Sequence, residues 1–221
     1  MRQQWADYRV FWQEFRRTFE TTGAVLPSGP ALAAALARHV REPADDAAER
    51  RILEAGPGTG SVTARILRDM RAGDRLVMVE RNEQFVARLR ERFASHPAFA
   101  HENNGDARIK LVHAGIEELP EDTKFDVIIS GLPLNNFPVP LVEQILAKLL
   151  RLLAPGGTLS FFEYIAIRRV KSLLSSPPER LRLSGIGAAM ERLFDAGEVI
   201  HDRVLANVPP AWVHHVMTKH E

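Results

Sequence analysis

One acid and three glycines with a chemically suggestive spacing follow the first strongly apolar run of the chain, namely Glu54, Gly56, Gly58 and Gly60. Glycine lets the backbone turn sharply and approach a ligand with no Cβ in the way. The helix expected from Ser61 would present its free N–H groups at the same place. The loop therefore indicates a small-molecule site, and a plain glycine-rich turn is the alternative.

Two nucleotide-binding patterns do not match this loop. A G-x-G-x-x-G pattern counted from Gly56 or Gly58 puts Ser61 or Thr63 where the third glycine belongs. The phosphate-binding pattern G-x-x-x-x-G-K-[ST] is absent.

A second acid, Glu80, stands at the end of the next apolar run, RLVMVE. An acid at the end of the second strand of an open parallel sheet is placed to hydrogen-bond the hydroxyls of a ribose. A carboxylate can accept from two adjacent hydroxyls at once. A solvent-exposed acid at a strand end is the alternative, but the glycine loop and Glu80 together favour binding of a nucleoside-containing cofactor.

The elements that must position these residues alternate between strands and helices, which predicts a doubly wound α/β fold. Near-continuous apolar runs such as LVMV and DVIIS are typical of parallel strands that are covered on both faces. The expected strands are residues 51–55, 75–80, 109–114, 125–130, 158–165, 198–206 and 212–219. The expected helices are residues 3–20, 31–41, 61–70, 83–95, 139–153 and 178–195.

Composition excludes several classes of protein. The 221 residues are 45% hydrophobic and contain no cysteine, which excludes disulfide frameworks, cysteine-ligated metal centres and thiol nucleophiles. The formal net charge of +1 does not favour a nucleic-acid partner. The 8 histidines form no metal-binding motif, so no metal is expected. Because no apolar run is long enough to span a membrane and no secretory signal is seen, a cytoplasmic protein is expected.

The glycine loop and Glu80 together resemble the cofactor site of class I S-adenosylmethionine (SAM)-dependent methyltransferases. The resemblance implies a Rossmann-like, mostly parallel seven-stranded sheet and SAM as the cofactor. Because His113-Ala114-Gly115-Ile116-Glu117 lacks the Asp that many relatives use for the adenine, the resemblance implies a contact through backbone groups near Ile116 or through Glu117. The cofactor-binding residues implied are Glu54, Gly56, Gly58, Gly60, Glu80, Arg81, Ile116, Glu117 and Ser130.

The segment SGLPL after the fourth strand resembles the NLPY tetrapeptide of amino-methylating enzymes, with Gly131 in place of Asn. Together with TGAVLPSGPAL, LLAPGGTLSFFEY and NVPPAWVHHV, it makes the chain similar to bacterial phospholipid N-methyltransferases. The resemblance implies that the carbonyls of Gly131 and Leu132 orient the acceptor amine and that Pro133 stiffens the turn. Tyr164 is the candidate to orient the amine or to receive its proton through water. Tyr164 and Phe137 are the candidate aromatic faces for a methylated, cationic product.

An aromatic stripe with basic residues marks the start of the chain, which predicts an amphipathic helix that lies on an anionic membrane surface. Packing of this stripe on the protein's own core is the alternative. The lipid-facing candidates are Trp5, Tyr8, Trp12, Phe15, Arg16 and Phe19 there, and Arg168, Arg169 and Lys171 in a later loop. We expect residues 1–45 to form a helical arm and residues 46–221 the SAM-binding domain.

Three functions remain open on the sequence. The first is N-methylation of an amino-lipid headgroup at the inner leaflet of the cytoplasmic membrane. That lipid is phosphatidylethanolamine on its way to phosphatidylcholine, or a related one such as ornithine lipid. The second is an rRNA adenine N6-dimethyltransferase, which shares the glycine loop. The third is a non-enzymatic protein that binds lipid on the same fold. The sequence carries no signal for the oligomeric state.

Overall fold

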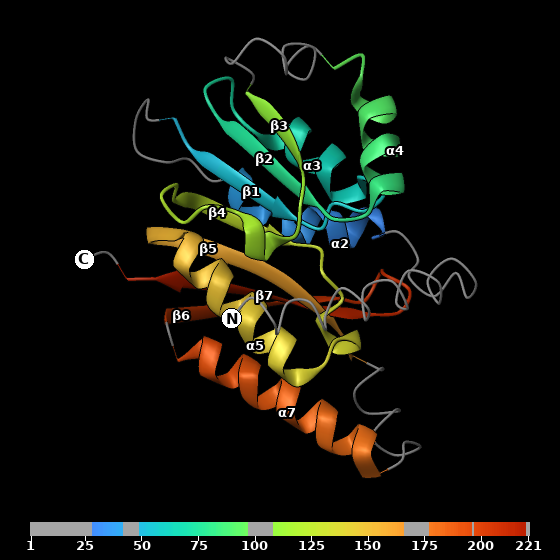
Figure 1. The fold of residues 1–221 in the computed structure, drawn as a ribbon, viewed down its shortest axis with the longest axis vertical. Coiled ribbons are helices and arrows are strands. Elements are labelled where there is room, and N and C mark those ends of the chain that lie inside the picture. Colours follow the sequence, from blue (N-terminus) through green and yellow to red (C-terminus); the bar gives the residue numbers. More distant parts are fainter. Residues whose placement is uncertain (1–27, 42–48, 97–107, 166–176, 196, 220–221) are drawn as a thin grey trace.

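One seven-stranded sheet organises the computed structural model, which describes residues 28–41, 49–96, 108–165, 177–195 and 197–219. The strand order is β3-β2-β1-β4-β5-β7-β6. Strands β1 to β5 are parallel, and β7 pairs antiparallel with both β5 and β6 (Figure 1). The strands are β1 Arg51–Ala55, β2 Arg75–Glu80, β3 Ile109–His113, β4 Phe125–Ser130, β5 Leu153–Tyr164, β6 Gly197–Val204 and β7 Ala211–Thr218.

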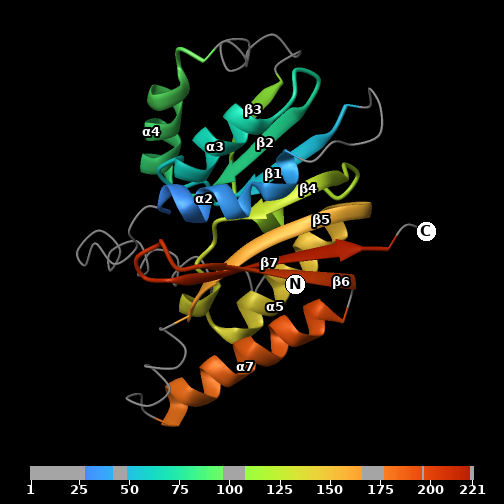
Figure 2. The same cartoon turned by 180° about the vertical axis from the view of Figure 1, so that it is seen from behind.

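Helices cover both faces of the sheet, as expected for a doubly wound fold. One hydrophobic cluster joins one face of the sheet to α2 (Pro30–Leu36), α3 (Ser61–Asp69) and α4 (Glu83–Phe93). The other face packs on α5 (Val139–Leu152) and α7 (Pro177–Phe194). Figure 2 shows α2 and α3 in front of the sheet, and Figure 1 shows α5 and α7 there. Short 3₁₀ turns are η1 Arg38–Val40, η3 Ile116–Glu118 and η4 Leu134–Asn136.

Two elements differ from the sequence prediction. Strand β5 begins at Leu153 instead of Thr158, because α5 continues directly into it and Leu153 pairs with Phe125 of β4. The helix predicted for residues 31–41 ends at Leu36 and continues as the 3₁₀ turn η1.

Helix α2 is part of the core beneath the sheet. Its Leu32 and Leu36 are fully buried, as is Val40 of η1, in the cluster that contains α3 and α4. The predicted boundary at residue 45 stays a prediction, and α2, which falls within the predicted arm, packs in the core of the described fold. None of the helices in the described ranges is long and apolar enough to cross a membrane.

Candidate cofactor and acceptor site

The glycine loop after β1 is held open by left-handed backbone. Gly56, Gly58 and Gly60 have φ angles of 71°, 57° and 80°, a region that side chains with a Cβ rarely adopt. A Cβ added to Gly58 would meet no atom within 4 Å. The loop backbone at Gly58 therefore borders open space, as a ligand cradle requires.

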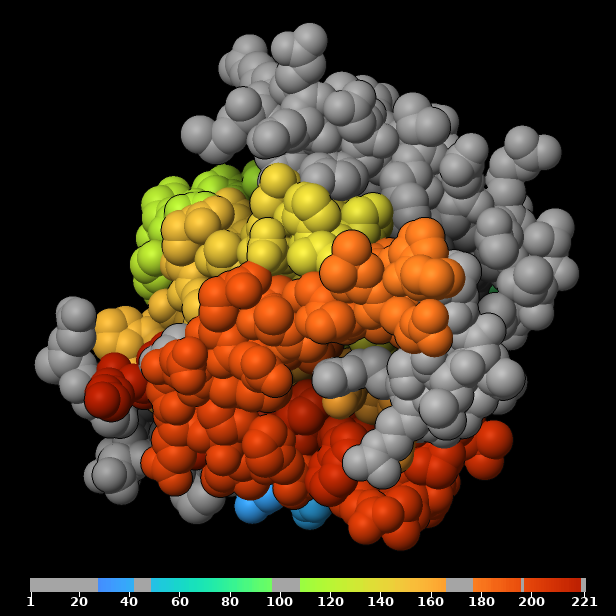
Figure 3. Space-filling model, turned by 90° about the horizontal axis from the view of Figure 1, so that it is seen from below, coloured from blue at the N-terminus to red at the C-terminus, as the bar shows by residue number. Residues whose placement is uncertain are grey.

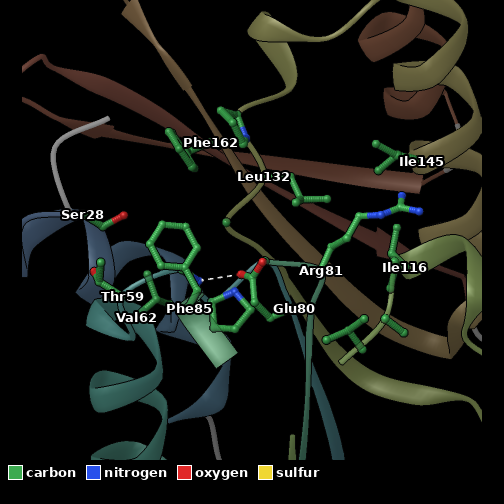
Figure 4. Close-up of a pocket in the computed structure, with 18 of the residues that line it drawn as sticks. Ser28, Thr59, Val62, Glu80, Arg81, Phe85, Ile116, Leu132, Ile145 and Phe162 are labelled. Atoms are coloured by element: carbon green, nitrogen blue, oxygen red, sulfur yellow. Dashed lines mark hydrogen bonds between the residues drawn. The ribbon is translucent and has the colours of Figure 1, made fainter. Parts of the chain in front are cut away.

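Glu80, at the end of β2, connects this loop to the next one. Its Oε2 accepts from the backbone N–H of Gly58 at 3.0 Å (Figure 4). Its Oε1 accepts from the backbone N–H of Asn82 at 2.8 Å. Burial raises the pKa of this carboxyl, and the backbone hydrogen bonds oppose the shift. A carboxylate has about four acceptor positions, so Glu80 retains capacity for the hydroxyls of a ribose.

Behind the loop, Glu54 has only 1% of its surface exposed and accepts a hydrogen bond from Thr63 Oγ1 at 2.7 Å. Burial raises the pKa of Glu54 to about 8. Ser130 is also fully buried, and its Oγ accepts from the backbone N–H of Leu132 at 3.4 Å. Neither side chain is part of the cavity wall. In this structure both support the loops that form it.

Gly60 has a packing role in the structure. A Cβ at Gly60 would lie 2.9 Å from both Leu89 Cδ2 and Phe93 Cε2 of α4. The glycine therefore allows the start of α3 to pack closely on α4, and it does not line the cavity.

The cavity lies at the carboxyl ends of β1, β2 and β4, where open α/β sheets bind their ligands. Figure 4 shows Phe162 and Ser28 on one side of it and Arg81 and Ile116 on the other. Its wall contains Gly56, Gly58, Glu80, Arg81, Ile116 and Glu117 as predicted, and also Gly131, Leu132 and Pro133. Sequence analysis did not identify the further wall residues Ser28, Pro57, Thr59, Ser61, Val62, Val79, Phe85, Ala114, Gly115, Leu141, Ile145 and Phe162.

The adenine side of the predicted site is built around an ion pair. Arg81 Nη1 donates to Glu117 Oε1 at 2.5 Å, and the two side chains are about three quarters and nine tenths buried. Ile116 lies on the same wall. The adenine would thus meet Ile116 and a carboxylate that is already neutralised by Arg81, in place of the Asp of many relatives.

The segment after β4 approaches the glycine loop unusually closely. A Cβ at Gly131 would lie 2.5 Å from the carbonyl oxygen of Gly56, and a Cβ at Gly56 would lie 2.6 Å from Leu132 Cδ2. Such a distance is sterically forbidden, so Asn could not replace Gly131 without a backbone shift. This contact explains why the tetrapeptide begins with glycine here.

Pro133 forms an inverse γ-turn, with φ −79° and ψ 71°. The N–H of Leu134 donates to the carbonyl of Leu132 at 2.9 Å across it. The carbonyl oxygen of Leu132 therefore has one of its two lone pairs in use, and the second remains for the amine it was predicted to accept from.

The aromatic residues near the acceptor side differ in their placement. Phe162 of β5 lines the cavity, and the Tyr164 ring packs edge-on against it at 5.1 Å. Tyr164 is partly buried, which raises the pKa of its hydroxyl, and it is not part of the cavity wall. Phe137 is fully buried in the cluster beneath α5. It is a core residue, and the prediction that it faces the product was wrong.

The predicted membrane residues lie outside the described ranges. They are Trp5, Tyr8, Trp12, Phe15, Arg16, Phe19, Arg168, Arg169 and Lys171. Within the described part of the chain, no group of three or more ligand-type side chains is arranged to hold a metal ion. The expectation that no metal is needed stays a prediction.

This strand order, with a glycine loop after β1 and an acid at the end of β2 facing one cavity, defines the class I SAM-dependent methyltransferases. A family model described as a methyltransferase domain matches residues 52–157. Over 155 residues the chain is 32% identical to an ornithine lipid N-methyltransferase of Singulisphaera acidiphila, which covers 69% of this chain and 75% of that protein. The chain belongs to the SAM-dependent methyltransferases and is an enzyme of that family, with SAM as its cofactor.

Other relatives are more distant. A ribosomal RNA small subunit methyltransferase A of Gloeobacter violaceus is 38% identical over 101 residues, 45% of this chain but only 29% of that protein. The N-methyltransferase NodS of Bradyrhizobium japonicum has a TM-score of 0.57 at 16% identity, covering 85% of this chain and 94% of that chain. The O-methyltransferase TomG of Streptomyces achromogenes, in complex with SAM, also gives 0.57, at 18% identity and 86% and 79% coverage. These structures support the fold alone.

Proposed function

We propose that the enzyme transfers methyl groups from SAM to the amino headgroup of a membrane lipid. The proposed acceptor is phosphatidylethanolamine, which successive methylation converts towards phosphatidylcholine, and ornithine lipid is the alternative. SAM supplies an electrophilic methyl group, and the protein must hold the amine in line with it. The residues that would hold SAM are the glycine loop, Glu80 and the Ile116–Glu117 segment.

The observation that carries the proposal is the distribution of charge in the cavity wall. Among the described residues of the wall, the charged ones are Glu80, Arg81 and Glu117, and all three are hydrogen-bonded or ion-paired on the cofactor side. The opposite side presents Phe162, Leu132 and Pro133. An apolar, aromatic wall suits an amine that must lose its proton before it attacks, because burial disfavours the ammonium form.

The same wall suits the product of each step. A methylated ammonium is stabilised over the face of an aromatic ring, and Phe162 supplies such a ring in the cavity. Phe162 therefore takes the role that the sequence had suggested for Phe137. Tyr164 stays the proposed group for orienting the amine, since its ring packs on Phe162.

The second part of the proposal concerns contact of the enzyme with the membrane. Ser28, the first residue that the structure describes, lines the cavity. We propose that the aromatic and arginine stripe at residues 5–19 lies on the anionic inner leaflet of the cytoplasmic membrane and that Arg168, Arg169 and Lys171 contact lipid phosphates. The enzyme would then act as a peripheral membrane protein.

Methylation of rRNA adenine is the less favoured alternative. Even a ribosomal RNA methyltransferase that aligns with 82% of this chain is matched over only 57% of its own length, against 75% for the ornithine lipid N-methyltransferase. Gly131 leaves no room for the Asn side chain of the amino-methylating tetrapeptide. The net charge of +1 also gives little general attraction for RNA phosphates.

The deciding experiment supplies radiolabelled SAM together with three acceptors in separate reactions. These are anionic vesicles containing phosphatidylethanolamine, the same vesicles containing ornithine lipid, and unmodified small-subunit rRNA. We expect label in the extracted lipid and identify the lipid by chromatography. Label in the RNA alone would overturn the proposal.

A further inference from the structure

Arg182 of α7 connects two distant parts of the chain next to the acceptor side of the cavity. Its Nη1 donates to the backbone carbonyls of Asn135 at 3.0 Å and of Phe137 at 2.8 Å. Its Nε and Nη2 donate to the two carboxylate oxygens of Glu179, at 2.8 and 2.6 Å. The two-pronged pair with Glu179 fixes the plane of the guanidinium, so Nη1 points at the two carbonyls.

The carbonyls that Arg182 binds belong to residues 131–137, here called the acceptor segment, whose first residues form the acceptor side of the cavity wall. Gly131, Leu132 and Pro133 line the cavity, and the same chain passes through η4 to Phe137 only a few residues later. The N–H of Phe137 donates back to the carbonyl of Leu134 at 3.1 Å, and that of Asn136 donates to the carbonyl of Pro133 at 2.9 Å. This short hydrogen-bonded path links Arg182 to Pro133.

A second contact from the same face of α7 supports this link. A Cβ at Gly185, three residues after Arg182, would lie 2.8 Å from Val139 Cγ2 at the start of α5. The absence of a side chain at Gly185 therefore lets α7 approach the end of the acceptor segment closely. Figure 3 shows the first turns of α7 in light orange beside the yellow segment that includes the start of α5.

The acceptor segment has little freedom to shift without affecting the cavity. Gly131 packs against the carbonyl of Gly56, and Leu132 packs against Gly56 itself. A small displacement at η4 would therefore move the wall against which the acceptor must be aligned. A misplacement of about 1 Å can cost on the order of a hundredfold in rate.

We propose that Arg182 is a positioning residue for methyl transfer, which holds the 131–137 segment in the geometry that aligns the acceptor with the methyl group. It acts through backbone carbonyls and touches neither cofactor nor acceptor. The proposal rests on the methyl transfer that the family establishes, and it does not depend on which amine is the acceptor.

The first test needs no acceptor. Hydrogen–deuterium exchange is measured for wild type, Arg182→Gln and Arg182→Lys with SAM bound. We expect faster exchange of the Leu134, Asn136 and Phe137 amides in Arg182→Gln, with unchanged exchange in strand β1. Arg182→Lys keeps the charge and one donor nitrogen but loses the planar fork, so its exchange rates should lie between those of wild type and Arg182→Gln. Exchange in 134–137 equal to wild type in both variants would overturn the proposal.

The second test is kinetic and uses phosphatidylethanolamine, or ornithine lipid if that is the acceptor, in mixed micelles. Arg182→Gln should lower kcat at saturating SAM about ten- to a hundredfold, with SAM affinity within about twofold of wild type. The matched control is Arg192→Gln, because Arg192 is also on α7 and pairs with Glu143 of α5, far along the helix from η4. The control should keep the wild-type kcat.

The outcomes separate this proposal from the proposed function. If the wild-type enzyme methylates neither lipid, the lipid assignment fails, and the exchange measurement still decides the role of Arg182. If SAM affinity falls together with kcat, Arg182 supports the whole cavity and the positioning role is wrong. If Arg182→Gln fails to fold, Arg182→Lys provides both measurements.

Discussion

Two residues, Gly58 and Glu80, connect the sequence pattern to cofactor binding most directly. Glu80 accepts from the N–H groups of Gly58 and Asn82 and remains able to accept from a ribose. Glu80→Ala should weaken SAM binding by tenfold or more, since hydrogen bonds to a charged group contribute about 1.5–3 kcal/mol each. Gly58→Val should weaken it as well, because φ is 57° there and the side chain would enter the cavity.

Titration calorimetry with SAM measures these affinities. Glu80→Gln is the matched control, because it keeps the length of the side chain and one of the two accepting oxygens, while the charge and the second accepting oxygen are lost. It should bind SAM more tightly than Glu80→Ala. Unchanged SAM affinity in both Glu80→Ala and Gly58→Val would contradict the assignment of this loop to the cofactor.

For Tyr164, on the acceptor side, we expect a substitution to lower turnover and to leave SAM affinity unchanged. Its hydroxyl is proposed to act on the amine, and its ring packs on Phe162 outside the cofactor half of the cavity. Tyr164→Phe keeps the ring and removes the hydroxyl, so turnover should fall about tenfold or more while SAM affinity stays near wild type. Single-turnover rates at saturating SAM, with a parallel SAM titration, measure the two effects. A loss of SAM affinity with normal turnover would contradict the role.

At the scale of elements, the sequence predicted the five parallel strands to within a few residues. Runs such as FDVIIS are apolar on both faces because helices cover both sides of the sheet, so their ends coincide with the first polar or glycine residue. The start of β5 was missed because Pro155-Gly156-Gly157 looks like a turn, whereas strand pairing with β4 extends it back to Leu153.

The cavity wall was predicted only in part, for a physical reason. Glycines and acids at strand ends have characteristic spacing, whereas Phe162 lies in a strand that is buried on both faces. Alternation cannot tell which aromatic of FFEY faces a ligand and which faces the core. Ser28 and Phe85 reach the cavity only through the packing of α2 and α4, which no local pattern encodes.

The predicted membrane-binding role of the N-terminal helix can be tested by deletion. Deleting residues 1–20 should abolish binding to anionic vesicles and leave SAM binding intact, because the deletion removes none of the core residues within the described part of the chain, which begin in α2. Binding of the wild-type protein to vesicles should weaken in high salt without vanishing. Salt screens the attraction between the arginines and the anionic lipids, but it does not remove the contribution from burial of the aromatic side chains.

Vesicle sedimentation with a parallel SAM titration separates the alternatives. Replacing Trp5, Trp12 and Phe15 with Ala should reduce vesicle binding at any salt concentration. A deletion through residue 41 is the structural control, because it removes the buried Leu32 and Leu36 and should destabilise the whole domain. Loss of SAM binding with the shorter deletion would instead show that the stripe belongs to the core.

Two buried groups, His215 and Glu54, should make the free energy of unfolding of the whole molecule depend on pH in opposite directions. The pKa of His215 is lowered to about 4, chiefly by burial and then by the nearby His39, whereas Asp202 opposes the shift. Its Nδ1 lies 2.8 Å from Ser160 Oγ, and its Nε2 lies 3.4 Å from Asp202, which pairs with Arg38. The unfolded state binds the proton first, so His215 contributes stability above about pH 6.5 that is lost as the pH falls towards 4.

Glu54 acts with the opposite sign, because its pKa of about 8 in the folded protein lies above the ordinary value of 4.5. The folded protein keeps a proton there that the unfolded chain has lost, so stability decreases as the pH rises from about 4.5 to 8. The two slopes nearly cancel between about pH 4.5 and 6.5. Above about pH 6.5 the loss from Glu54 is no longer offset by His215. The pKa of Glu80 is also raised, so its contribution has the same sign as that of Glu54.

We therefore expect the free energy of unfolding of the SAM-free enzyme to be roughly flat from pH 5 to 6.5 and then to fall towards pH 8. Glu54→Gln removes the titrating group and keeps an acceptor for Thr63, so its stability should rise from pH 4 to 6.5 and fall much less above it. At pH 8 the variant should be more stable than wild type by on the order of 2–4 kcal/mol. Urea denaturation at each pH measures both curves. Parallel curves for the two proteins would show that Glu54 is already ionised in the folded state.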